Sequence, residues 1–181
     1  MNSIDDITKF QRLIVTPGDE HQKLYEDLIE EEWKEFESAI EIGNKIKEAC
    51  DVIVVCIGYR VAASNVIGVV DGDVCVTKFW KAFTWLNDAL GEDAANKALR
   101  LVNESNLSKF IFDEKNVSES LLWYSDRGIK TYGEAVDGRL IGIFSSEDQK
   151  VGGKEYKKGK LLKAEPFYKP VNEAELAGLV K

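Results

Sequence analysis

The chain of 181 residues is poor in the residue types on which several common functional sites depend. His21 is its only histidine, and its three cysteines form no CxxC pair, so Cys/His zinc spacing and a Ser-His-Asp set are both missing. It has no P-loop sequence and no two glycines spaced as Gly-x-Gly, which excludes the usual phosphate-binding and dinucleotide-binding loops. Functional residues must therefore be sought among other side chain types.

The chain also lacks long apolar runs and a net positive charge. No run reaches the length that spans a bilayer, and residues 1–6 show neither the basic nor the apolar region of a secretory signal. The formal charge of −8 argues against a nucleic-acid duplex as partner, because duplex binders neutralise phosphates with a basic face. Cys50, Cys56 and Cys75 are predicted to be reduced core thiols. We therefore expect a cytoplasmic protein that binds neither a membrane nor a duplex.

Carboxylates are abundant, and two pairs of them are spaced for chemistry. Glu32 and Glu35 are three residues apart, as are Glu48 and Asp51, so each pair lies on one face of a helix. The residues between the pairs allow a turn at 43–44 and a second, antiparallel helix. Four converging carboxylates repel one another unless a cation lies among them, and Mg²⁺ prefers such oxygen ligands. The alternative is an ordinary solvated acidic face.

The residues after Asp51 favour the metal site over the solvated face. Asp51 leads directly into the apolar run 52–58, and a carboxylate buried there without a partner would be costly. The pattern of acids also resembles that of a known family. It reads EExxE, a short spacer and ExxD, with Glu31, Glu32, Glu35, Glu48 and Asp51 at the acidic positions. In this it is similar to the MazG-like all-α nucleoside triphosphate pyrophosphohydrolases.

Two downstream segments extend the resemblance over roughly residues 5–170. Residues 106–109 read Asn-Leu-Ser-Lys and resemble the Asn-x-Ser-Lys segment of the phosphoribosyl-ATP pyrophosphohydrolase-like branch. The basic and aromatic segment 157–170 also resembles that branch, which is often met in phage genomes. This implies that Mg²⁺, or Mn²⁺ in its place, is bound by Glu32, Glu35, Glu48 and Asp51. It further implies that the substrate is bound by Asn103, Asn106, Ser108 and Lys109.

Two of these roles have a simpler alternative. Glu31 lies beside the ligands and could accept a proton from the attacking water, or could be a solvated acid. Residues 103–108 could bind the nucleotide, or could merely end a helix and open a turn. The aromatic residues of the chain leave the base-stacking residue unassigned, since most aromatic side chains at helical spacing belong to the core.

The expected function is Mg²⁺-dependent hydrolysis of nucleoside triphosphates, above all dNTPs, to the monophosphate and pyrophosphate. The resemblance implies a role in nucleotide-pool control. For a phage-encoded protein, this role would be carried out in the cytoplasm of the infected cell. One alternative is a pyrophosphohydrolase of alarmones such as ppGpp. Another is a non-catalytic helical module that contacts a basic partner through its acids. We also expect a homo-oligomer, a dimer or tetramer, because helix 45–63 is apolar on nearly every side.

The periodicity predicts a mostly α fold, an all-α NTP pyrophosphatase-like helical bundle with a small C-terminal β elaboration. Helices are expected over 4–15, 20–42, 45–63, 78–90 and 92–101, with a loop or short strand over 64–76. Strands are expected over 118–123, 129–136 and 140–144, and Asp137-Gly138 is a hairpin turn signal. Residues 1–110 form the predicted helical catalytic core. Residues 111–181 form a β-hairpin and a C-terminal wrap of the same domain, in which 147–170 return over the bundle.

Overall fold

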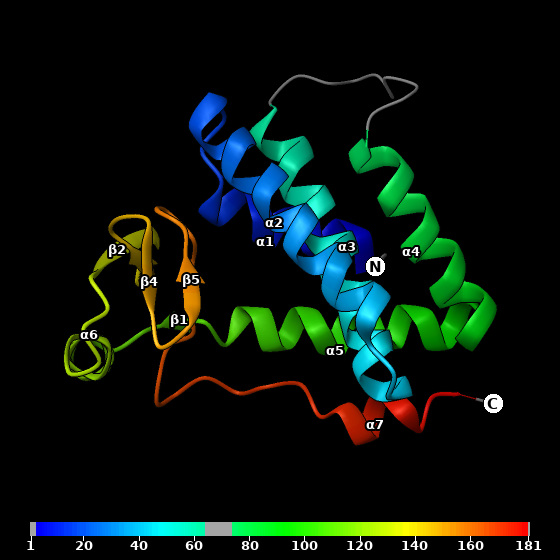
Figure 1. The fold of residues 1–181 in the computed structure, drawn as a ribbon. Helices are drawn as coiled ribbons and strands as arrows, with labels where there is room; N and C mark the ends of the chain where they lie inside the picture. Colours follow the sequence, from blue (N-terminus) through cyan, green and yellow to red (C-terminus); the bar gives the residue numbers. More distant parts are fainter. Residues whose placement is uncertain (1–2, 64–73, 181) are drawn as a thin grey trace. The chain divides into compact units, whose positions relative to one another are not determined.

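The fold is mostly α-helical with a small β portion, as the sequence predicts. The computed structural model describes residues 3–63 and 74–180 (Figure 1). Its helices are α1 (Ser3–Ile14), α2 (Asp19–Ser38), α3 (Ile42–Ala62), α4 (Val74–Leu90), α5 (Glu92–Leu107), α6 (Glu114–Ser125) and α7 (Glu173–Ala177). Its strands are β1 (Phe110–Ile111), β2 (Thr131–Asp137), β3 (Leu140–Ser145), β4 (Gln149–Val151) and β5 (Lys154–Tyr156). No helix within these ranges is both long enough and apolar enough to cross a membrane.

The chain divides into two compact units. The first contains residues 1–104 together with the C-terminal residues 171–181, and the second contains residues 105–170. The predicted division at 110/111 within a single domain stays a prediction. Most of the loop or short strand expected over 64–76 lies outside the described residues, and α4 already begins at Val74.

The first unit is built around α3, which packs against α1, α2, α4 and α7. The apolar run after Asp51 makes the middle of α3 buried on nearly every side, as expected of a central helix. Cys50, Cys56 and Cys75 are buried in this core as thiols, and no disulfide joins them. Helices α2 and α3 form a hairpin, so their acidic segments lie on adjacent helices (Figure 1).

The turn between α2 and α3 lies earlier than the sequence predicts. Helix α2 ends at Ser38, and α3 already begins at Ile42, so the expected turn at Gly43 is wrong. Gly43 is needed for close packing instead. A Cβ atom at this position would lie 2.1 Å from the backbone oxygen of Glu173, so only glycine lets α7 approach the start of α3. This short C-terminal helix was not predicted.

The second unit contains an antiparallel three-stranded sheet in the order β1-β3-β2. The predicted hairpin is confirmed, with a two-residue turn in which Gly138 has a φ of 54°. The strand expected over 118–123 is wrong, because these residues belong to α6. The Asp113 side chain caps that helix by accepting a hydrogen bond from the amide of Lys115.

The remaining strands and the following segment complete the second unit. Strands β4 and β5 form a separate two-stranded hairpin, and Gly152 and Gly153 lie in its turn with positive φ. Leu162 and Ala164 are buried in the same apolar cluster as Ile143 of β3. The burial that Leu162 requires is thus supplied within the second unit, while the predicted return of 147–170 over the bundle stays a prediction.

Candidate metal centre

The turn position brings the two acidic segments level with each other. Glu32 precedes the end of α2 by six residues, and Glu48 follows the start of α3 by the same number. In an antiparallel helical hairpin, positions equally distant from the turn lie side by side. At a rise of 1.5 Å per residue, both positions lie about 9 Å from the ends of their helices at the turn. Asp51 lies one turn further along the same face of α3. The hairpin therefore gathers carboxylates from both helices.

Three of the predicted ligands converge. One carboxylate oxygen from each of Glu32, Glu48 and Asp51 lies within 4.8 Å of the other two. Oxygens that share one octahedral cation at 2.0–2.1 Å lie up to about 4.2 Å apart, so small side-chain movements would close them around Mg²⁺ or Mn²⁺. Glu48 is buried, whereas Glu32 and Asp51 are half-buried. The set consists only of oxygen donors, which suits a hard divalent cation.

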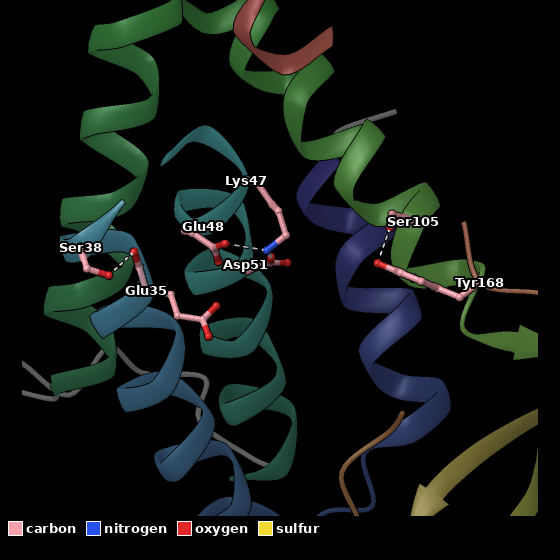
Figure 2. Close-up of polar contacts among 7 residues, drawn as sticks. All are labelled: Glu35, Ser38, Lys47, Glu48, Asp51, Ser105 and Tyr168. Carbon is pink, nitrogen blue, oxygen red and sulfur yellow. Dashed lines mark hydrogen bonds and ion pairs between the residues drawn. The ribbon is translucent and has the colours of Figure 1, made fainter. Parts of the chain in front are cut away.

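Lys47 already lies against two of these acids. Its ammonium Nζ donates to Glu48 Oε1 at 2.7 Å and to Asp51 Oδ2 at 2.9 Å (Figure 2). Burial lowers the pKa of Lys47, but the charge of Asp51 and the hydrogen bonds to both acids outweigh it, and the pKa lies above its ordinary value. Lys47 is therefore a permanent cation in this cluster.

Glu48 remains electrostatically unsatisfied in spite of Lys47. Burial raises its pKa to about 7, and the pairing with Lys47 opposes that rise without cancelling it. The pKa values of both partners are raised, which favours the charged form of Lys47 but the neutral form of Glu48. Lys47 has two acids beside it, whereas at Glu48 burial outweighs the single ammonium that it shares with Asp51. Glu48 is only 4% exposed, and its Oε2 has no hydrogen-bond partner among the described residues. A buried carboxylate oxygen without a donor fits a cation ligand.

Glu35 lies at the edge of the cluster rather than among the three converging acids. It is exposed and closer to the turn than Glu32, and its charge contributes to the raised pKa of Glu48. Figure 2 shows Glu35 on α2 beside Glu48 and Asp51 of α3. Glu31, the predicted proton acceptor, is half-buried on α2 and is not one of the three.

A hollow of about 540 Å³ opens beside Glu48. Its lining comes from the end of α2, the turn, the start of α3 and α7. The lining residues are Glu35, Ser38, Ala39, Ile40, Glu41, Asn44, Glu48 and Glu173. The hollow connects Glu35 with Glu48 and gives a ligand polar and acidic side chains, but no basic ones.

The predicted substrate-binding residues lie on or just beyond the end of α5. Asn103 belongs to the first unit, whereas Asn106, Ser108 and Lys109 belong to the second. Helix α5 runs to Leu107, past its expected end near Asn103, so both asparagines are helical and buried. Oδ1 of Asn103 and Nδ2 of Asn106 lack hydrogen-bond partners among the residues described.

Ser108 has a structural role that the sequence left open. Its hydroxyl donates to the Ser105 carbonyl at 2.7 Å and accepts from the amide of Lys169 at 3.0 Å. The backbone amide of the half-buried Lys109 donates to the Asn106 carbonyl, which continues the turn after the helix. These bonds agree with a segment that ends a helix and opens a turn. Binding of substrate by these residues stays a prediction.

The aromatic candidates for base stacking are mostly engaged with their neighbours. Trp33 packs on Phe36, with Lys78 and Lys81 over its ring, and Trp85 meets Phe36 edge-on. Each of these contacts lies within the first unit, and none of these rings lines the hollow. The structure therefore singles out no stacking residue at the hollow.

Sequence reasoning missed two contributors to the site. Lys47 had a readable signal, because a lysine four residues before Asp51 on a helix is placed to pair with it. Glu173 had none, since its place in the hollow depends on how α7 packs against α3. Protein-family models, curated proteins and solved structures were all compared with this chain, and none matches it. The case for a function therefore rests on the site's own geometry.

Proposed function

We propose that this chain hydrolyses nucleoside triphosphates, with dNTPs as the leading substrates, to the monophosphate and pyrophosphate, using Mg²⁺ held by its acids. The proposal depends on the convergence of Glu32, Glu48 and Asp51, together with a buried Glu48 oxygen that has no hydrogen-bond partner in the described part of the chain. A solvated acidic face does not explain that oxygen, because a surface carboxylate keeps its water. The motif spacing that resembles the MazG-like enzymes supports the same proposal.

Each acid has a part in this reaction. Glu32, Glu48 and Asp51 would hold the cation, and Glu35 would complete its ligands from the side of the hollow. When bound, Mg²⁺ would neutralise the phosphates and stabilise the charge that develops as water attacks the α-phosphorus. Glu31 stays the predicted acceptor of the proton from that water.

The hollow is the natural place for part of the substrate. It borders Glu48 and Glu35, so a nucleotide lying in it would reach the cluster. The acids of its lining would repel free phosphates, and they would favour a nucleotide that arrives as its metal complex. Their carboxylate oxygens can also accept hydrogen bonds from the amino groups of a base.

One observation favours a second, non-catalytic function. Lys47 already neutralises part of the cluster, as it would if the acids were only a structural ion pair in a module that binds a basic partner. Such a module would bind its partner in a salt-sensitive way without turnover. The two functions are therefore separated by a test for metal-dependent chemistry.

The test is a screen of all NTPs and dNTPs, with ppGpp added, for pyrophosphate release in the presence and absence of Mg²⁺. We expect Mg²⁺-dependent release from at least one dNTP. Release from ppGpp alone would identify an alarmone hydrolase instead. No release from any nucleotide, with Mg²⁺ or Mn²⁺ present, would contradict the proposed enzyme and favour the binding module.

A further inference from the structure

Lys47 competes with a metal for the same two carboxylates. Its Nζ lies within hydrogen-bond distance of Glu48 Oε1 and Asp51 Oδ2, and both residues belong to the converging acids. A divalent cation held by these carboxylates, with the unpartnered Oε2 of Glu48 among its ligands, would lie beside the ammonium and repel it. Binding of metal therefore requires Lys47 to loosen or leave at least one of its two contacts.

Lys47 has the freedom to move. Its side chain is 27% exposed, so it is not locked in the core as Glu48 is. A lysine carries its charge on a flexible four-carbon stem with three rotatable donors, and it can exchange one anionic partner for another. Leaving the acids unpaired is costly, so Lys47 would leave only when another cation replaces it.

A metal–nucleotide complex supplies both a cation for the two acids and a new anionic partner for Lys47. Its cation replaces the ammonium on Glu48 and Asp51, and its phosphates offer the displaced ammonium a new anionic partner. We propose that Lys47 is an internal counter-ion that competes with the divalent cation for Glu48 and Asp51 and transfers to a substrate phosphate when metal and nucleotide bind together. This inference rests on the proposed function.

The consequence is coupling between metal and nucleotide. Metal alone must displace Lys47 into solvent and so binds weakly, whereas metal with nucleotide recovers the lost ion pair on a phosphate. By linkage, the nucleotide tightens metal binding by the same factor as metal tightens nucleotide binding. Lys47 is thus a positioning residue that loads the cation together with the substrate.

The experiment measures Mn²⁺ binding by electron paramagnetic resonance, with and without a non-hydrolysable α,β-methylene dNTP analogue. The variants are Lys47→Met, which keeps most of the aliphatic stem, and Lys47→Arg, which keeps the charge. Lys34→Met is the matched control, because Lys34 is an exposed lysine on α2 outside the converging group. Circular dichroism verifies that each variant retains its helices.

We expect Lys47→Met to bind Mn²⁺ at least about ten-fold more tightly than the wild type without nucleotide, a change in the range known for residues around metal ligands. The factor by which the nucleotide analogue increases Mn²⁺ affinity should be smaller in Lys47→Met than in the wild type. Lys47→Arg and Lys34→Met should behave nearly as the wild type.

Two results would overturn the inference. Equal or weaker Mn²⁺ binding by Lys47→Met would show that Lys47 does not compete, and an unchanged effect of the analogue would show that it does not transfer to phosphate. Failure of the proposed function would be recognised by a different result, namely that the wild type releases no pyrophosphate from any nucleotide. Tighter Mn²⁺ binding by Lys47→Met in that case would support Lys47 as a counter-ion in a chain that is not an enzyme.

Discussion

The buried carboxylate of Glu48 in the first unit has one oxygen without a hydrogen-bond partner in residues 3–63 and 74–180, whereas the hydroxyls of Ser105 and Ser108 in the second unit are engaged in hydrogen bonds. Ser105 Oγ lies 2.9 Å from the hydroxyl of Tyr168 (Figure 2). It also donates to the carbonyl of Lys169 at 3.0 Å. A polar group whose bonding capacity is used up holds the chain together. A buried carboxylate oxygen with spare capacity is suited to bind a cation. The amide nitrogen of Asn106 and the hydroxyl of Ser120 also lack partners among the described residues, but neither carries a negative charge that would attract one.

The largest expected effect is that of Glu48→Gln, which keeps the size of the side chain and removes its charge. The variant should lose Mn²⁺ affinity and pyrophosphate release by at least about 100-fold, because a neutral amide is a poor ligand for a hard cation. Glu37→Gln is the control, since Glu37 is exposed on α2 and does not line the hollow. Near-normal activity of Glu48→Gln, or equal damage from Glu37→Gln, would remove the contrast between Glu48 and the engaged serine hydroxyls.

Variants of Glu31 and Glu35 would separate two roles within the site. Glu31 is predicted to accept a proton, and Glu35 is predicted to bind the metal. Glu31→Gln should lower turnover by about 100-fold or more, the usual contribution of a general base, and leave Mn²⁺ affinity unchanged. Glu35→Gln should weaken Mn²⁺ binding by several-fold. Steady-state kinetics and Mn²⁺ titration on the same samples separate the two roles. A Glu31→Gln variant with normal turnover would make Glu31 a solvated acid.

The raised pKa of Glu48 predicts how pH affects the metal-free protein. The folded state holds the Glu48 proton up to about pH 7, while the unfolded chain releases it near 4.5. The folded state therefore binds more protons in between, and the free energy of unfolding should fall by at most about 3 kcal/mol as the pH rises from 4.5 to above 7. The charges that face Glu48 are those of Lys47, Asp51, Glu35 and Glu32, with Glu173 across the hollow.

Urea denaturation at pH 5 and pH 8, with chelator, measures this fall. Saturating Mn²⁺ should reduce it, because a bound cation stabilises the ionised carboxylate. Glu48→Gln should flatten the pH dependence of the metal-free protein, since the amide does not titrate. A variant as sensitive to pH as the wild type would show that other groups cause the fall.

The acidic spacing was informative because it depends only on local geometry. Each pair at i, i+3 lies on one helix face wherever the helices end, so the spacing predicts Glu32, Glu35, Glu48 and Asp51 together without knowledge of the turn. Which acids converge depends on the turn itself. Its position makes Glu32 level with Glu48 and leaves Glu35 nearer the end of the hairpin.

Other features depend on contacts that no local pattern reveals. Gly43 reads as a turn residue, yet its missing side chain serves the packing of α7. The segment 118–123 reads as a strand, although Val117, Leu121 and Tyr124 recur at helical spacing and face one apolar cluster. The capping residue Asp113 is the signal that would have favoured a helix there.

The smallest expected effect tests the second unit. Ser108→Ala removes a hydroxyl that bonds the Ser105 carbonyl and the Lys169 amide, so it should lower the free energy of unfolding by about 1–2 kcal/mol. Mn²⁺ affinity should not change. Ser118→Ala is the matched control, because Ser118 is exposed and its hydroxyl donates to the Glu114 carbonyl of the same helix, so its loss should cost less than about 0.5 kcal/mol. If Ser108→Ala instead raised KM at unchanged stability, Ser108 would be a substrate ligand, and the engaged hydroxyls of Ser105 and Ser108 would no longer mark a purely structural network.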